Sequence, residues 1–270
     1  MTLNIRGQLL PLSPPIVMGI LNITPDSFYP GSRVSDTKDL VDRARKHLSE
    51  GATILDVGAC STRPDAAQPT SEEESARLRP ALQALRQALP DAILSVDTYR
   101  ADVARMAVEE YGVDIINDIA GGALDPDMFP TVAQLRTPYV LTHYTPVPPT
   151  ENAAATVLRD LAYRAQQLQD LGCKDIILDP GFGFNKTLEQ NYELLADLPL
   201  LRQLSLPVLV GISRKSMIQR PLHVDPTHAL NGTTVLHTII LRQHAADILR
   251  VHDTLPAMQA ITLTQTLSHD

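Results

Sequence analysis

Tryptophan is absent from this 270-residue chain, and cysteine is nearly so, with only Cys60 and Cys173. Two cysteines cannot build a disulfide framework, and no Cys-x-x-Cys pair offers a zinc or redox motif, so we expect a reducing, cytoplasmic location. Long apolar runs are also missing. The N-terminus is interrupted by Asn4, Arg6 and Gln8, and no later run approaches membrane-spanning length. We therefore expect no signal peptide, no membrane span and no membrane partner.

Positive charge is in deficit, with 23 Lys and Arg against 31 Asp and Glu and a net charge of −8. A general nucleic-acid surface needs dense Lys and Arg, so we expect no nucleic-acid partner. Aromatic residues make up only 4% of the chain although 44% is hydrophobic. The core is therefore predicted to consist of aliphatic side chains, which suits the layered interior of an α/β barrel.

What the chain does contain is a series of short apolar runs that each end on a polar or ionisable residue. Buried parallel strands are continuously apolar, and in a (β/α)8 barrel the loops after the strands share one rim where ligands bind. The polar endings are therefore expected to face one cavity. The eight runs are Ile16–Asn22, Ile54–Asp56, Ile93–Asp97, Ile115–Asn117, Tyr139–His143, Ile176–Asp179, Val208–Ser213 and Ile248–Asp253.

Amphipathic helical patterns separate these runs, and three of them stop at Gly51, Gly112 and Gly172, shortly before a strand. Ser71 and Glu74 form a predicted capping box at one helix start. Eight strand–helix units predict an α/β fold, a single-domain (β/α)8 TIM barrel over residues 1–270, with the core at about 16–267 and an N-terminal hairpin within 1–15 closing the bottom. An open Rossmann-like sheet is the alternative, although no Gly-x-Gly-x-x-Gly follows a strand.

The rim residues predict a planar heterocycle as ligand. Asp97, Asn117 and Asp179 supply acceptors for ring N–H and amino groups, and Lys215 supplies a donor for a carbonyl or ring nitrogen. This set complements a guanidine-like ring such as a pterin or a purine.

A second group of rim residues predicts a phosphate on that ligand. Arg63 lies in a Ser-Thr-Arg-Pro segment, and Arg250 and His252 lie at the last strand. Arginine forks match phosphate oxygens, and loops near the last strands of a barrel often hold phosphate. We therefore expect a heterocycle that carries a phosphate or pyrophosphate.

Seven segments in order closely resemble the dihydropteroate synthase family, from about Ile16 to Asp253. They are Met18–Phe28 (MGILNITPDSF), Leu55–Gly58 (LDVG) with Ser61–Pro64 (STRP), Ser95–Thr98 (SVDT), Ile116–Ile119 (INDI), Leu178–Phe184 (LDPGFGF), Gly211–Ser216 (GISRKS) and Arg250–Asp253 (RVHD).

The resemblance implies a transferase of folate biosynthesis, and a sulfonamide target, that joins 7,8-dihydropterin-6-ylmethyl diphosphate to 4-aminobenzoate and releases pyrophosphate. It also implies Mg²⁺ and a homodimer. By the same resemblance, the catalytic residues are Asp97, Lys215, Arg63, Arg250 and His252. The substrate-binding residues are Thr62, Pro64, Asp97, Asn117, Asp179, Phe184, Lys215, Ser216, Arg250 and His252, and the residue associated with the metal is Asn22.

The chain departs from the family pattern at the fifth strand. The family commonly has Met-His-Met after this strand, where one methionine packs on the pterin, and Thr142 or Tyr144 stands in its place here. In the loop after the first strand, Asp26 is the one acidic residue expected near the amine substrate. Cys60 directly precedes Ser61 in the second loop. Loops 24–34 and 61–70 are expected to order around pyrophosphate, so that 4-aminobenzoate binds second.

Several alternatives stay open from the sequence. Asp56 is interpreted as a cap of the following helix rather than as a site residue, and His143 as a buried structural histidine. A zinc site of Cys60, His143 and His252 matches no local zinc spacing.

Two alternative functions stay open as well. One is another enzyme, a methyltetrahydrofolate:corrinoid methyltransferase, and the other is a catalytically idle pterin-binding paralogue. The helix face with Val235, Leu236, Ile239 and Ile240 packs on the barrel or forms a dimer seam.

Overall fold

The structure is a computed structural model that describes residues 1–23, 33–59 and 69–267. Within these residues, parallel strands form an eight-stranded sheet in the order β8-β7-β6-β5-β4-β3-β10-β9, and a parallel bridge between Leu178 and Val208 joins its edges. The predicted single-domain (β/α)8 barrel is confirmed, and the open sheet is wrong because the edges pair. The strands are β3 (Ile16–Asn22), β4 (Ile54–Gly58), β5 (Ile93–Asp97), β6 (Ile115–Asp118), β7 (Tyr139–Thr142), β8 (Ile176–Asp179), β9 (Leu209–Val210) and β10 (Ile248–Val251).

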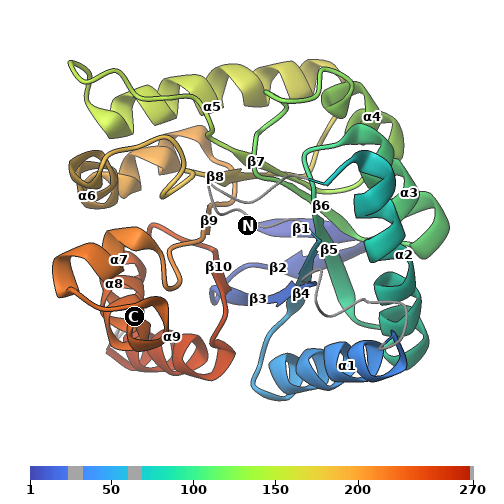
Figure 1. Cartoon of the computed structure of the whole chain (residues 1–270). Coiled ribbons are helices and arrows are strands. Elements are labelled where there is room, and N and C mark those ends of the chain that lie inside the picture. Colours follow the sequence, from blue (N-terminus) through green and yellow to red (C-terminus); the bar gives the residue numbers. More distant parts are fainter. Residues whose placement is uncertain (24–32, 60–68, 268–270) are drawn as a thin grey trace.

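Helices surround the strands in chain order (Figure 1). Their apolar faces pack on the outside of the barrel, as with Leu78, Leu82 and Leu85, all fully buried. The helices are α1 (Arg33–Ser49), α2 (Ser71–Ala88), α3 (Ala101–Tyr111), α4 (Met128–Leu135), α5 (Ala153–Asp170), α6 (Leu188–Ala196), α7 (Ser216–Leu222), α8 (Leu230–Arg242) and α9 (Thr254–Leu267), with 3₁₀ turns at Leu198–Leu204 and Pro226–His228. No described helix is both long and apolar enough to cross a membrane.

The glycine stops are confirmed. Gly112 follows α3 in the left-handed conformation, with φ of 61°, and its N–H donates to the carbonyl of Val108 at 3.0 Å. Gly51 and Gly172 also have positive φ, 103° and 92°. Because glycine has no Cβ, each turn reverses the chain within a few residues and starts the next strand.

The predicted capping box is displaced by one residue. Thr70, not Ser71, is the N-cap of α2; its hydroxyl accepts from the N–H of Glu73, whose carboxylate accepts from the N–H of Thr70. The pattern Ser/Thr-x-x-Glu occurs in both registers. Glu74 is instead fully buried and pairs with Arg100, and this tertiary contact selects the register.

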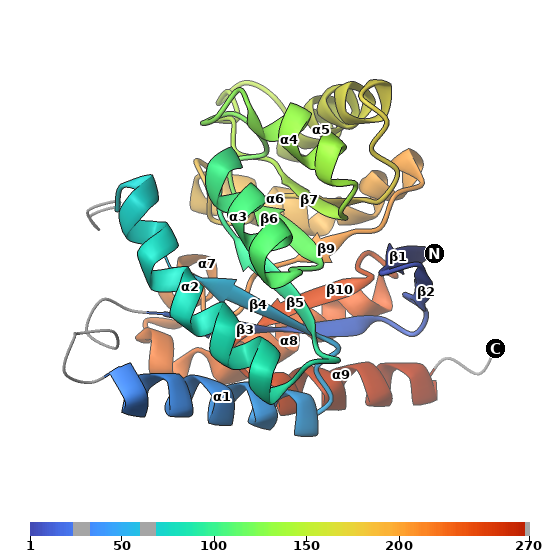
Figure 2. The same cartoon turned by 90° about the vertical axis from the view of Figure 1, so that its right-hand side faces the viewer.

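Before the barrel, β1 (Thr2–Ile5) and β2 (Gln8–Pro11) form an antiparallel hairpin. Leu3, Ile5 and Leu12 pack against the first interior residues of the barrel strands, including Met18 and Ile54. Figure 2 shows the hairpin at the end of the barrel where the strands begin. The hairpin therefore covers the end opposite the strand termini.

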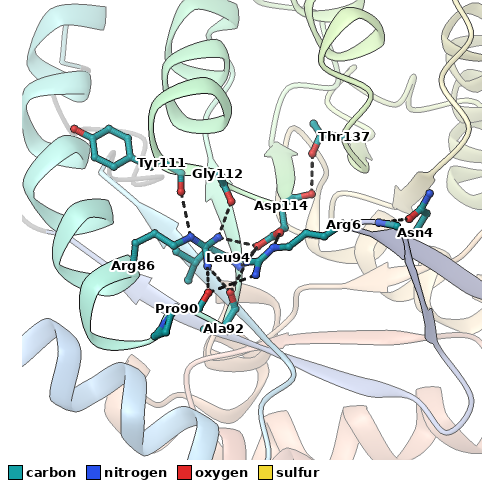
Figure 3. Close-up of polar contacts among 11 residues, drawn as sticks. Asn4, Arg6, Arg86, Pro90, Ala92, Leu94, Tyr111, Gly112, Asp114 and Thr137 are labelled. Carbon is teal, nitrogen blue, oxygen red and sulfur yellow. Dashed lines mark hydrogen bonds and ion pairs between the residues drawn. The ribbon is translucent and has the colours of Figure 1, made fainter.

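A buried carboxylate ties this hairpin to the barrel (Figure 3). Asp114 accepts from Nε and Nη2 of Arg6 at 2.5 and 2.8 Å, from Nη2 of Arg86 at 2.9 Å and from the N–H of Leu94 at 2.9 Å. Both guanidinium groups also donate to the carbonyl of Ala92. One carboxylate thus joins the hairpin, α2 and the starts of β5 and β6.

Candidate active site

Strand alternation decides which polar side chains enter the barrel. In β4, Ile54 belongs to the interior cluster, whereas Leu55 packs against the helices. Asp56 therefore points inward, two residues after Ile54, because successive side chains alternate between faces. The same alternation directs seven other polar strand residues inward: Asn22, Ser95, Asp97, Asn117, Thr142, Asp179 and Arg250.

Arg250 connects two carboxylates across the barrel interior. Its Nε donates to Oδ2 of Asp56 at 2.7 Å, and its Nη2 donates to Oδ2 of Asp97 at 2.6 Å. The amide Nδ2 of Asn117 also donates to Oδ2 of Asp56, at 3.0 Å. The other oxygen of Asp56, Oδ1, is buried and has no hydrogen-bond partner among the described residues. An unpaired buried carboxylate oxygen is costly, which points to a bound ligand or water at this position.

Asp179 and Lys215 stand on the adjacent part of the interior. Oδ1 of Asp179 accepts from the N–H of Gly181 at 2.8 Å. Nζ of Lys215 donates to the carbonyl of Phe182 at 2.7 Å and lies 4.7 Å from the centre of the Phe184 ring. An ammonium and an aromatic face therefore lie together, and the Asp179 carboxylate is close enough to interact with the ammonium charge.

Burial changes the ionisation of these groups. It raises the pKa of Asp97 to about 7, although Arg250 opposes the rise, and it raises the pKa of Asp179, with Lys215 opposing. Burial lowers the pKa of Lys215 to about 8, while Asp179 acts in the opposite direction. Burial also acts to lower the pKa of Arg250, but Asp56 and Asp97 outweigh it and the net shift is upward. Shifted groups of both signs in one cluster are typical of a functional site.

The residues after β9 and β10 meet at the barrel mouth. Nδ1 of His252 lies 3.1 Å from Oγ of Ser213, and the backbone N–H of His252 donates to the same oxygen at 3.3 Å. Desolvation, together with the charge of Arg250, lowers the pKa of His252 to about 4, so the ring is neutral at neutral pH. Arg214 pairs with Asp253 at 2.7 and 2.9 Å, and Ser216 opens α7 as an exposed residue.

A magnesium ion fits Asn22 only as a partly hydrated ion. In the residues that the structure describes, no group of three or more His, Cys, Asp or Glu side chains is placed to hold a metal. Oδ1 of Asn22 lies 3.8 Å from the position that a Cβ on Gly58 would take, and that position is 3.4 Å from Cβ of Asp97. Mg²⁺ commonly keeps several waters and binds few protein oxygens together with substrate phosphates. One amide oxygen at the mouth suits such an ion.

Most of the predicted loops 24–34 and 61–70 lies outside the described residues, and with them several residues singled out in the sequence. Thr62, Arg63 and Pro64 fall within 60–68, as does Cys60, and Asp26 falls within 24–32. The other predicted site residues lie at or near the ends of barrel strands at one end of the barrel.

Asp56 is the site residue that sequence reasoning missed. Its interpretation as a helix cap is wrong, because Thr70 caps α2 and Asp56 binds Arg250 and Asn117 inside the barrel. The signal was present in the sequence, since Asp56 follows the interior residue Ile54 by two positions. Alternation within the strand outweighs the general tendency of aspartate to cap helices.

The end of β7 separates the two candidates for the missing methionine. Thr142 pairs in register with Asp179 and points inward, with its hydroxyl buried and unpartnered among the described residues. Tyr144 lies beyond the strand, with its ring 6.3 Å from that of Phe184. His143 is fully buried on the helix side, where Nε2 is 3.7 Å from Asp160. It therefore faces away from His252, so these two histidines of the zinc alternative do not meet, while Cys60 lies outside the described residues.

Comparison with known proteins agrees with this geometry. The profile of the pterin binding enzyme family matches residues 18–252. The dihydropteroate synthase of Escherichia coli K12 is 39% identical over 278 residues, covering 99% of this chain and 97% of the relative. The Xanthomonas albilineans dihydropteroate synthase with 4-aminobenzoic acid superimposes with a TM-score of 0.90 at 36% identity, over 100% of this chain and 98% of that one. The same enzyme in complex with 7,8-dihydropteroate gives a TM-score of 0.87 at 34% identity, over 100% of both chains. The chain therefore belongs to the pterin-binding enzyme family, among its dihydropteroate synthases, which are transferases.

Proposed function

We propose that this chain condenses 7,8-dihydropterin-6-ylmethyl diphosphate with 4-aminobenzoate and releases 7,8-dihydropteroate and pyrophosphate. The observation that carries the proposal is the buried cluster in the barrel mouth. Three carboxylates and an amide (Asp56, Asp97, Asp179 and Asn117) lie together with Lys215 and Arg250 in a chain of this family.

The cluster suits a dihydropterin ring. Ionised Asp179 accepts hydrogen bonds from the amino and ring N–H groups, and the unpaired Oδ1 of Asp56 offers another acceptor. Lys215 donates to the ring carbonyl or a ring nitrogen. A buried site built to hydrogen-bond a ligand discriminates strongly against analogues that lack the matching groups, because its own polar atoms are then left unpaired.

The mouth residues suit the diphosphate. Among the described residues the guanidinium of Arg250 bonds only Asp56 and Asp97, which occupy Nε and Nη2, so Nη1 and further N–H groups remain for a phosphate oxygen. Ser213 donates to Nδ1 of His252 in the arrangement we propose, so the neutral ring carries its proton on Nε2 and donates it to the leaving group. Arg63 is proposed to add a second guanidinium. These donors stabilise the negative charge that grows as pyrophosphate leaves.

The substitution is proposed to be dissociative and SN1-like. Departure of pyrophosphate leaves positive charge on the pterin methylene, which the electron-rich ring delocalises and the carboxylate of Asp97 stabilises before the aniline nitrogen attacks. Phe184, with Thr62, Pro64 and Ser216, orients the amine for that attack. Positional scrambling of ¹⁸O in recovered pterin diphosphate supports this order of bond changes. Absence of scrambling, with a rate that follows amine nucleophilicity, contradicts it.

Magnesium is proposed as the cofactor, held by Asn22 together with the substrate diphosphate. When bound, the ion neutralises phosphate charge and so makes pyrophosphate a better leaving group. The expected signature is that Asn22→Ala raises the Mg²⁺ concentration required for half-maximal rate. An unchanged requirement contradicts the role of Asn22.

A homodimer in the cytoplasm completes the proposal. On α8, Leu236 and Ile240 pack toward the barrel, whereas Val235 and Ile239 are 50% and 43% exposed. We propose the exposed pair as part of the dimer seam. Sedimentation equilibrium tests the assembly, and a monomer at micromolar concentration contradicts it.

One assay separates this function from its rivals. Purified protein is incubated with the pterin diphosphate, 4-aminobenzoate and Mg²⁺, and dihydropteroate and pyrophosphate are quantified. Formation of both in equal amounts supports the proposal. A methyltransferase or an idle paralogue forms neither, and the idle paralogue still binds the pterin in calorimetry.

A further inference from the structure

Lys186 lies just outside the site, where the loop after β8 ends, and is half-buried. Its Nζ donates to the carbonyls of Gly181 at 2.9 Å, Phe184 at 3.2 Å and His143 at 3.4 Å. An ammonium has three N–H donors, so three backbone acceptors satisfy it completely. No described carboxylate lies within ion-pairing distance of it. The group is therefore used to bind backbone rather than to pair charge.

The loop after β8 needs an ammonium among its carbonyls because its backbone is sharply folded. Gly181, Gly183 and Asn185 all have positive φ, at 68°, 82° and 47°. A Cβ on Gly181 would lie 2.0 Å from the carbonyl oxygen of His143, so only glycine permits this approach of the β8 loop to the β7 loop. Carbonyls that converge in this way repel one another unless a cation lies between them.

The same loop carries the aromatic residue expected at the amine subsite. The ring of Phe184 is 4.7 Å from Nζ of Lys215 and 6.3 Å from the ring of Tyr144. Lys186 binds the Phe184 carbonyl and so fixes the backbone from which that ring projects. Asn185 makes a parallel link, donating to the carbonyl of Tyr144 at 2.7 Å.

We propose that Lys186 is a positioning residue for the amine substrate, acting through Phe184. Its ammonium clamps the β7 and β8 loops together and holds the Phe184 ring against Lys215, where 4-aminobenzoate is bound. This inference rests on the proposed function, because it assigns Phe184 to the amine subsite. Burial lowers the pKa of Lys186 to about 7, and the charge of Asp179 opposes this shift.

A double-mutant cycle tests the proposal. Lys186→Met keeps an unbranched side chain one atom shorter and removes the charge, and Phe184→Ala removes the ring. Lys174→Met is the control because Lys174 is exposed. We expect Lys186→Met to raise KM for 4-aminobenzoate about tenfold and KM for the pterin diphosphate less than about twofold, with Lys174→Met at wild-type values. In the Phe184→Ala background Lys186→Met should have little further effect, because the two residues act as one unit.

Other outcomes overturn the proposal. An equal rise in both KM values, an unchanged KM for 4-aminobenzoate, or multiplying effects in the double mutant means that Lys186 does not act through Phe184. If Lys186→Met does not fold, Lys186→Arg, which keeps a cation but not its geometry, enters the same cycle. A crystal structure of the variant gives a readout that needs no turnover: Phe184 displaced from Lys215 supports the proposal, and an unmoved ring refutes it. Failure of the wild type to form dihydropteroate refutes the proposed function instead.

Discussion

Arg250 shows how a single residue ties the two halves of the proposed substrate together. Its guanidinium bonds Asp56 and Asp97, which belong to the ring-binding cluster, and faces the mouth where the diphosphate is proposed to lie. Deep burial makes both carboxylates expensive to ionise unless a cation stays beside them. Ring recognition and diphosphate binding therefore depend on one shared charge.

Replacement of Asp97 by asparagine tests its electrostatic role. Asp97→Asn keeps the shape and removes the negative charge that faces Arg250 and the proposed cationic intermediate. We expect kcat to fall about 100-fold, the usual size for loss of a preorganised charge, with a small change in KM for 4-aminobenzoate. Steady-state kinetics measure this, with exposed Asp39→Asn as the control. A kcat within about threefold of wild type contradicts the role.

The pH profile follows from two shifted groups. Asp97 with a pKa of about 7 must be ionised, and Lys215 with a pKa of about 8 must be protonated. We therefore expect kcat/KM for the pterin diphosphate, whose binding Lys186 affects little, to rise with pH through about 7 and to fall above about 8, a bell shape reporting the free enzyme. Lys215→Arg should lose the descending limb, because arginine does not deprotonate in this range. A flat wild-type profile from pH 6 to 9 contradicts the assignment.

At the scale of elements, each end of the barrel is held by a polar centre that joins separate segments. Lys186 joins the loops after β7 and β8 through three carbonyls. At the other end Asp114 joins the hairpin and α2 to the barrel through Arg6 and Arg86. Several backbone groups converge at each centre. The side chains there supply the hydrogen bonds that water would otherwise make with these groups.

Loss of the Asp114 carboxylate should destabilise the fold without affecting the site. Asp114 has a side chain only 2% exposed, whereas Arg6 is 43% exposed. Asp114→Asn leaves the more buried Arg86 without its charge partner, so we expect the free energy of unfolding to fall by about 3 kcal/mol. Arg6→Met should cost about 1 kcal/mol, because this partner is solvated.

Urea unfolding measures both variants, again with Asp39→Asn as the matched control. Both KM values should stay at wild-type levels, since Asp114 directly precedes β6, at the end of the barrel where the strands begin. A large change in KM with unchanged stability argues against a structural role for this carboxylate.

At the scale of the whole molecule, stability is coupled to pH through buried histidines. His143 and His237 are 0% and 2% exposed, and burial lowers the pKa of each from 6.5 to about 4. Both are therefore neutral in the folded state and accept protons more readily when the chain unfolds. Their contribution is complete above pH 6.5 and is lost as the pH falls from there toward 4.

His237→Gln isolates one of these contributions. Between pH 7 and 5, the wild type should lose about 2 kcal/mol more unfolding free energy than the variant, because glutamine does not titrate. Denaturation at both pH values measures this. Exposed His223→Asn is the control, since asparagine tolerates the positive φ of 53° at that position. Equal pH slopes for wild type and His237→Gln refute the coupling.

The sequence by itself determined the strand–helix alternation and the glycine stops, because apolar periodicity and local turn chemistry are properties of neighbouring residues. The family was indicated by the seven motif segments. Two strand ends differ from the predicted ones: β9 is limited to Leu209–Val210 within the predicted Val208–Ser213, and β4 extends to Gly58. Tertiary structure alone decided the capping register beside Glu74, the inward place of Asp56 and its bond to Arg250. Asp56 and Arg250 are 194 positions apart, and only closure of the barrel brings them into contact. Local pattern sets which elements form, whereas contacts between elements set which side chains share a site.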